Sequence, residues 1–164
     1  MTRWAMIADL RRCVGCQTCT AACKHANGTP PGVQWRRVLD VEVGEFPDVQ
    51  RAFIPIGCQH CDEPACLPAC PTTATRKRED GIVTIAYDLC IGCAYCTVAC
   101  PYQARFKTPA GVFAYGSTPT ENEERRDEAS QRSVATKCTF CVDRIDAGLE
   151  KGLKPGRDRS GAHV

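Results

Sequence analysis

Residues 90–101 are CIGCAYCTVACP, with cysteines at positions 90, 93, 96 and 100 and a proline after the last one. Three thiols separated by two residues each can converge from one tight loop, whereas the fourth begins a helix and faces away from them. The small residues Gly92 and Ala94 let the loop backbone approach whatever the thiols bind. This stretch therefore predicts a loop around a compact, thiolate-bound group, with the last cysteine serving a second such group.

The same pattern of cysteines occurs three more times in the 164-residue chain. The first motif has the spacing of residues 90–100, the second has four residues in its middle gap, and the fourth contains two cysteines only. Such self-similarity indicates a repeated structural unit. In chain order, these motifs contain Cys13, Cys16, Cys19 and Cys23, then Cys58, Cys61, Cys66 and Cys70, and finally Cys138 and Cys141.

Fourteen cysteines have three explanations, which are a disulfide scaffold, zinc sites or iron–sulfur clusters. A disulfide scaffold would need an oxidising compartment, yet the N-terminus MTRWAMIADL reaches charged residues before an apolar signal segment can form. Zinc knuckles use two cysteines each, so zinc stays an alternative mainly for Cys138 and Cys141. The spacing C-x2-C-x2-C-x3-C-P is that of bacterial ferredoxins, in which the last cysteine of each motif ligates the cluster of the paired motif. The pattern thus favours 4Fe-4S clusters.

Charge and hydropathy limit the partners. The formal net charge of +2 counts each cysteine as a neutral thiol, whereas a four-thiolate cubane carries roughly two negative charges when oxidised, so the loaded chain is mildly acidic. The longest basic run is RKR at residues 76–78, which argues against nucleic acid as the main partner. No window approaches the ~18 apolar residues of a membrane span, so we expect no direct membrane span.

The expected fold class is α+β, with bacterial ferredoxin-like pseudo-repeats of short strands and short helices around the clusters. Alternating apolar residues predict strands at residues 4–8, 38–43, 53–56 and 82–85, with a hairpin turn at 79–81. Helices are expected at residues 18–25, 64–70, 94–100 and 140–150. Residues 108–136 carry mixed charge and predict a solvated loop or short surface helix, with a partner-docking surface as the alternative.

Other polar residues stand near the motifs. We expect His25 and His60 to form hydrogen bonds or lie at the surface, because each complete motif already supplies its thiolates. Four cations either raise reduction potentials or are simply solvated: Lys24, Arg76, Lys77 and Arg105.

Four such motifs in this order, with the longer gap in the second and KCTFCVDR at residues 137–144, resemble the iron–sulfur subunit of molybdopterin oxidoreductases. The resemblance covers residues 4–156. This family includes dimethyl sulfoxide, polysulfide, thiosulfate and tetrathionate reductases and sulfite dehydrogenases. The segments ADLRRCVGCQTC at residues 8–19 and GCQHC at residues 57–61 look most similar to the sulfite dehydrogenase branch.

The resemblance implies a ligand set for each cluster, with motifs two and three forming one pair and motifs one and four another. One inner cluster would be held by Cys58, Cys61, Cys66 and Cys100, and the other by Cys90, Cys93, Cys96 and Cys70. The outer sites would use Cys13, Cys16 and Cys19 in one case, and Cys138, Cys141 and Cys23 in the other. Residues 58–100 would form the inner half and residues 1–57 with 101–150 the outer half, followed by an extended or disordered tail at 151–164.

The family continues beyond KPG at residues 154–156 to a further C-x3-C-P, whereas this sequence ends in RDRSGAHV. We therefore expect a chain that is C-terminally incomplete, through truncation or a shifted reading frame. Each outer site is then left with three thiolates, which predicts a 3Fe-4S cluster or an empty site.

The function implied by the resemblance is electron transfer, without catalysis by the chain itself. Single electrons would pass through 4Fe-4S clusters between a molybdopterin catalytic subunit and a membrane anchor subunit that reacts with quinone. The chain would be peripheral to the membrane, on the cytoplasmic side or alternatively the periplasmic side. The alternatives are a free diffusible polyferredoxin and a structural subunit with an interrupted row of clusters.

Overall fold

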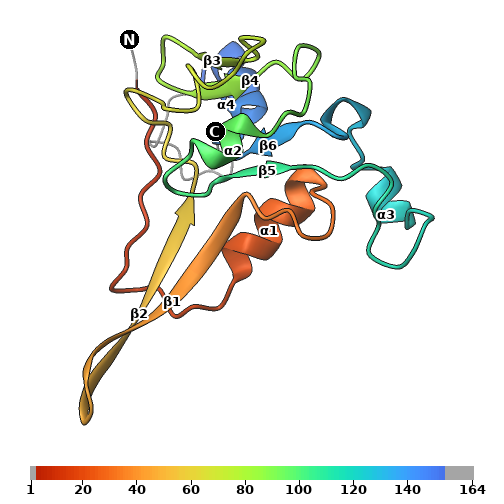
Figure 1. Cartoon of the computed structure of the whole chain (residues 1–164). Coiled ribbons are helices and arrows are strands. Elements are labelled where there is room, and N and C mark those ends of the chain that lie inside the picture. The colour runs from red at the N-terminus through yellow and green to blue at the C-terminus, as the bar shows by residue number, and fades with distance from the viewer. Residues whose placement is uncertain (1–2, 154–164) are drawn as a thin grey trace.

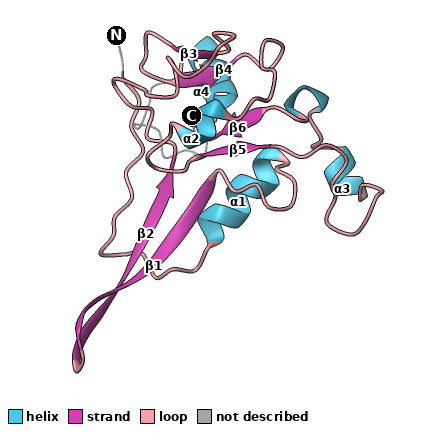
Figure 2. Cartoon of the chain, in the orientation of Figure 1, coloured by secondary structure: helices cyan, strands magenta, loops and turns pink. Residues whose placement is uncertain are grey.

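The computed structural model describes residues 3–153, which form short helices and three separate two-stranded antiparallel sheets (Figure 1, Figure 2). The strands are β1 (Arg36–Glu45), β2 (Asp48–Gly57), β3 (Thr75–Lys77), β4 (Val83–Ile85), β5 (Arg105–Lys107) and β6 (Ala135–Lys137). The helices are α1 (Thr18–Asn27), α2 (Tyr95–Val98), α3 (Glu121–Glu124) and α4 (Val142–Glu150), with one 3-10 turn at Ala129–Gln131. The mixture of short helices and short strands agrees with the predicted α+β class.

The longest sheet is the β1–β2 hairpin, which projects away from the rest of the chain as a twisted ribbon (Figure 1). Its register runs from Arg36 opposite Gly57 to Glu45 opposite Asp48. Only the base of the ribbon packs against the body, and the Phe46 side chain at the tip is 92% exposed. The predicted strands at 38–43 and 53–56 are confirmed, and both lie within this hairpin.

The two small sheets repeat one local design after motifs two and three. In each repeat the Cys-Pro turn closes with an N–H donated three residues back, from Thr73 to the Cys70 carbonyl at 3.2 Å and from Gln103 to the Cys100 carbonyl at 3.1 Å. A three-residue strand then begins, β3 in the first repeat and β5 in the second. Thr75 and Arg105 therefore occupy equivalent positions, each as the first residue of its strand.

Two of the predicted elements are wrong. Residues 4–8 form no strand, and the Ile7 side chain is 92% exposed. Residues 64–70 form turns instead of a helix, with the Leu67 N–H bonded to the Pro64 carbonyl at 2.9 Å. The physical reason is Pro68, which has no N–H to donate to residue 64 and whose ring obstructs a continuing helix.

The remaining predictions are confirmed with adjusted ends. The hairpin turn at 79–81 joins β3 to β4, and the Ile82 N–H bonds to the Asp80 carboxylate at 3.1 Å. Helix α1 extends to Asn27 and ends at Gly28, whose left-handed backbone (φ 57°) lets its N–H bond to the Lys24 carbonyl. Helix α2 is a single turn, and α4 begins two residues later than expected, directly after Cys141. The part of the predicted tail beyond residue 153 lies outside the described residues.

The core is small and consists partly of thiols. Val33, Trp35 and Cys138 form its buried centre, and the partly buried side chains around them are Cys23, Cys58, Phe106 and Phe140. The Trp35 indole N–H donates to the Thr136 hydroxyl at 3.0 Å and so joins the start of β1 to β6. Of the helices within residues 3–153, none has the length and apolar character that crossing a membrane requires.

Candidate functional site

The four cysteine motifs share one backbone feature. The residue before the second cysteine has a positive φ in every motif: Gly15 at 69°, His60 at 47°, Gly92 at 66° and Phe140 at 57°. Such values are uncommon for residues other than glycine and concentrate at functional sites. The sequence indicated this turn at the two glycines, but nothing in the letters marked His60 and Phe140.

The third motif is held by a close approach to the segment before β6. A Cβ added at Gly92 would stand 2.0 Å from the Ser133 carbonyl oxygen. Two residues further, the Ala135 N–H points at the Cys90 sulfur at 3.5 Å. N–H groups directed at sulfur stabilise thiolates and tune the group they bind.

Four thiols from two motifs line one narrow cavity in the structure: Cys70, Cys90, Cys93 and Cys96. Three come from motif three, while Cys70 comes from the end of motif two. Burial raises the pKa of the Cys70 thiol, but hydrogen bonds from the Thr75, Thr72 and Ala74 N–H groups and the Thr72 hydroxyl outweigh it and lower the pKa to about 7. These are the four cysteines that the family resemblance grouped as one ligand set.

A second group of thiols lies beyond Arg105. Burial raises the pKa of Cys66, the positive charge of Arg105 opposes this rise, and the nearby Cys58 thiol adds to it. Cys58 and Cys66 are therefore close enough for their charges to interact. The remaining members of the predicted set, Cys61 and Cys100, are partly buried, and their place in this group stays a prediction.

The outer motifs bring three thiols together. Burial raises the pKa of Cys23 to about 11, and the nearby Cys138 and Cys141 thiols contribute to the rise. The Asn27 side-chain amide also points at the Cys23 sulfur, at 3.6 Å. By contrast, Cys16 and Cys19 of motif one are exposed, and Cys13 is partly exposed.

Two cations are buried between these groups, and they are direct partners in the β5–β6 sheet. Arg105 is 5% exposed and Lys137 is fully buried. The Lys137 ammonium donates to the carbonyls of Val83 and Cys138. The sequence placed Arg105 near the motifs without predicting its burial, and it indicated no role for Lys137.

Two buried nitrogen atoms have no hydrogen-bond partner among the described residues, Arg105 Nη2 and His60 Nε2. Arg105 uses its other terminal nitrogen, Nη1, to bond the Thr75 hydroxyl at 3.1 Å. His60 accepts the Val83 N–H at Nδ1 (2.9 Å), so its proton resides on Nε2. Burial and the charge of Lys137 lower the pKa of His60 to about 3, which keeps the ring neutral. The predicted hydrogen-bonding role of His60 is confirmed.

These features fit an iron–sulfur cluster. All fourteen cysteines are free thiols, and soft thiolates are the ligands that iron–sulfur clusters require. The buried Arg105 and His60 nitrogens need acceptors, which thiolates and inorganic sulfides can provide. Within residues 3–153, no three Cys, His, Asp or Glu side chains are arranged to hold a single metal ion.

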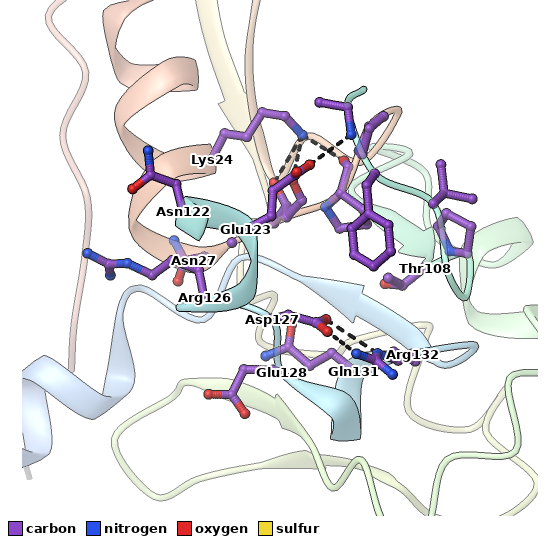
Figure 3. Close-up of a pocket in the computed structure, with 18 of the residues that line it drawn as sticks. Lys24, Asn27, Thr108, Asn122, Glu123, Arg126, Asp127, Glu128, Gln131 and Arg132 are labelled. Atoms are coloured by element: carbon purple, nitrogen blue, oxygen red, sulfur yellow. Dashed lines mark hydrogen bonds and ion pairs between the residues drawn. The ribbon is translucent and has the colours of Figure 1, made fainter. Parts of the chain in front are cut away.

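A larger cavity of about 360 Å³ lies between α1 and residues 108–132 (Figure 3). Its lining contains no cysteine and includes the Lys24 side chain, whose ammonium donates to the carbonyls of Thr29 (2.7 Å) and Pro30 (2.6 Å). Lys24 therefore fastens a loop and its charge is engaged there. The predicted short surface helix is α3, which begins with reciprocal hydrogen bonds between Thr120 and Glu123.

Comparison with known proteins identifies the family. Residues 49–114 match the 4Fe-4S dicluster domain family. The iron–sulfur subunit of arsenate respiratory reductase from Shewanella sp. is 37% identical over 174 residues, which cover 90% of this chain and 74% of that protein. The chain belongs to the family of iron–sulfur subunits of reductases. It is also similar to a selenate reductase subunit of Mesobacillus selenatarsenatis and a tetrathionate reductase subunit of Salmonella typhimurium.

These two relatives are 42% identical over 165 residues and 44% identical over 149 residues, respectively. Both alignments cover 90% of this iron–sulfur subunit but only 54% and 51% of the relative. The chain therefore spans about half the length of these curated relatives. The 4Fe-4S dicluster match itself contains motifs two and three, with the cavity that Cys70 shares with motif three.

Proposed function

We propose that this chain is the electron-transfer subunit of a larger oxidoreductase and performs no bond chemistry itself. It would relay single electrons between a molybdopterin catalytic subunit and a membrane subunit that reacts with quinone. The cavity lined by Cys70 together with Cys90, Cys93 and Cys96 is the observation that carries the proposal. A thiol from one motif beside three from the next is the crossed arrangement that ferredoxin-type clusters use.

Two inner 4Fe-4S clusters would have complete ligand sets. Cys70 would complete the set of motif three, and Cys100 would complete the set of Cys58, Cys61 and Cys66. This exchange between the motifs is what makes residues 58–100 the inner half in our proposal. A cluster of this type accepts and releases one electron at a time.

The outer sites would have three thiolates each from residues 1–164, so we propose 3Fe-4S clusters or empty sites there. The charge interaction of Cys23 with Cys138 and Cys141 supports one of these two sets. The other set, Cys13, Cys16 and Cys19, rests on the spacing of motif one. Residues outside this sequence could complete either site.

The remaining residues would hold and cover the clusters. N–H groups of Thr75 and Ala135 would donate to the thiolates of Cys70 and Cys90, and burial of the thiols would limit access of water. The names of the relatives, as subunits of reductases, favour a complex over a free polyferredoxin. We propose peripheral attachment to the membrane through the partners, on the cytoplasmic side, with the periplasmic side as the alternative. The substrate stays open, and the likeness to sulfite dehydrogenases stays a prediction.

Iron and acid-labile sulfide per chain, measured on anaerobically purified protein together with EPR, test the proposal. About 8 irons would mean that only the inner pair is loaded, about 14 with an oxidised 3Fe signal that the outer sites hold on three thiolates, and about 16 that outside ligands complete them. Protein that contains zinc and almost no iron would refute the proposal.

The crossed ligation has its own test. Cys70→Ser and Cys90→Ser should affect the same cluster signal, although the two residues belong to different motifs. Cys58→Ser and Cys100→Ser should affect the other signal. If Cys70→Ser instead altered the cluster that Cys58→Ser alters, each motif would bind its own cluster and the proposed ligand sets would be wrong.

A further inference from the structure

Arg105 occupies an unusual position for an arginine. It is 5% exposed and begins β5, shortly after the Cys100-Pro101 turn. The equivalent residue in the preceding repeat is Thr75, 4% exposed, and the two side chains meet through a 3.1 Å hydrogen bond. The positive charge therefore lies between the two repeats and is contributed by only one of them.

Both inner thiol groups are next to this side chain. Arg105 lines the cavity of Cys70, Cys90, Cys93 and Cys96. Its charge also acts on Cys66, where it opposes the effect of burial on the pKa of that thiol. One guanidinium thus stands between two sites that belong to different predicted ligand sets.

The guanidinium has one hydrogen-bonding position left over. Nη1 bonds the Thr75 hydroxyl, while Nη2 is buried and has no partner among residues 3–153. An unpaired donor on a buried charged group is costly, so folded proteins almost always supply an acceptor for it. The sulfurs of the two neighbouring thiol groups are electron-rich and can accept this hydrogen bond.

We propose that Arg105 is a positioning residue that raises the reduction potentials of both inner clusters, an inference that rests on the proposed function. Its Nη2–H would donate to a cluster sulfur, and its permanent charge would act on the neighbouring cluster as well. Reduction adds one electron, and hence one negative charge, to a cluster. A buried cation beside it favours the reduced form, because its attraction is weakly screened inside the protein.

The test is a potentiometric titration of the wild-type chain and three variants with dithionite, followed by EPR. Arg105→Gln removes the charge but keeps an N–H donor, and Arg105→Lys keeps the charge but loses the planar fork. Arg76→Gln is the matched control, because Arg76 lies in β3 beside Thr75 with its side chain exposed to solvent. Iron content is measured for each protein before the titration.

We expect Arg105→Gln to lower the ratio of reduced to oxidised cluster at least tenfold at a fixed potential for both inner clusters, which corresponds to about 59 mV per cluster. Arg105→Lys should keep most of the wild-type potential, and Arg76→Gln should resemble the wild type. Loss of clusters in Arg105→Gln, with wild-type iron and potentials in Arg105→Lys, would equally support a role for the charge.

Three results would overturn the inference. These are unchanged potentials in a fully loaded Arg105→Gln protein, equal shifts in Arg105→Gln and Arg105→Lys, and loss of iron in both variants, which would make Arg105 a residue required for packing. A wild-type protein without iron would contradict the proposed function instead, so the two failures are distinguishable.

Discussion

Gly92 is the position at which the structure predicts the sharpest effect of a single methyl group. Its φ of 66° lies in the left-handed region, and an added Cβ would stand 2.0 Å from the Ser133 carbonyl oxygen. That carbonyl is held in place because the Ser133 N–H bonds to the Thr108 carbonyl (3.0 Å), while the Thr108 N–H bonds to the Val134 carbonyl (2.9 Å). Gly92→Ala must therefore displace either the cysteine loop or the segment that enters β6.

The magnitude has two parts. The left-handed conformation costs an alanine about 1–2 kcal/mol, and forcing an extra carbon into a packed site adds about 1–3 kcal/mol. Gly111 separates the two contributions, since its φ of 65° is almost the same and nothing lies within 4 Å of its added Cβ. Ala94, which already has a φ of 65° in the same motif, shows that the conformation alone is tolerated there.

The assay is the loss of visible cluster absorption on heating under anaerobic conditions, for Gly92→Ala, Gly111→Ala and the wild type. An additional 1–3 kcal/mol corresponds to roughly 2–12 °C in a chain of this size, so Gly92→Ala should lose its clusters that much earlier than Gly111→Ala. Iron content should also fall in Gly92→Ala alone. Equal melting of the two variants with equal iron would refute the reasoning, because the contact with Ser133 would then carry no energetic weight.

Lys24→Met should destabilise the chain by about 1.5–3 kcal/mol in denaturant titrations, because it leaves several carbonyls without their charged donor, and it should not shift cluster potentials. In the iron-free chain, Cys70 should reach half its maximal alkylation rate near pH 7 and Cys23 near pH 11, as followed by mass spectrometry; a common midpoint would contradict both assignments. A double-mutant cycle on the half-exposed pair Arg78 and Asp146 should give a coupling of at most about 1 kcal/mol. Since Arg78 lowers the pKa of Asp146, that coupling should persist above pH ~4 and disappear as the pH falls below it.

The sequence was most informative where few residues separate the interacting groups. Short spacing confines the geometry of a cysteine loop locally, so motif three predicted a tight loop whose glycine backbone approaches a neighbouring segment. Long alternation likewise predicted the β1–β2 hairpin. The strands β3, β5 and β6 were missed because three residues are too few to show a period, and because each contains a lysine or arginine that reads as surface.

The buried cations could not be predicted for a different reason. Arg105 and Lys137 are far apart in the chain and become neighbours only when β5 pairs with β6. Charged residues are almost never fully buried without partners, so a sequence alone favours the exposed position. The helix expected at 64–70 failed through the opposite oversight, because Pro68 was a local signal that outweighed the cysteine spacing.

The pairing of β5 with β6 also has a practical consequence. Lys107 lies opposite Ala135, so the chain leaves the body and returns to it at neighbouring points. Everything between them is an excursion whose length can change without moving the cysteines on either side. At its far end Gly116 has open space around it, which makes that turn a suitable place to splice in an affinity tag, a fluorescent protein or an attachment to an electrode while leaving the wiring of the molecule intact.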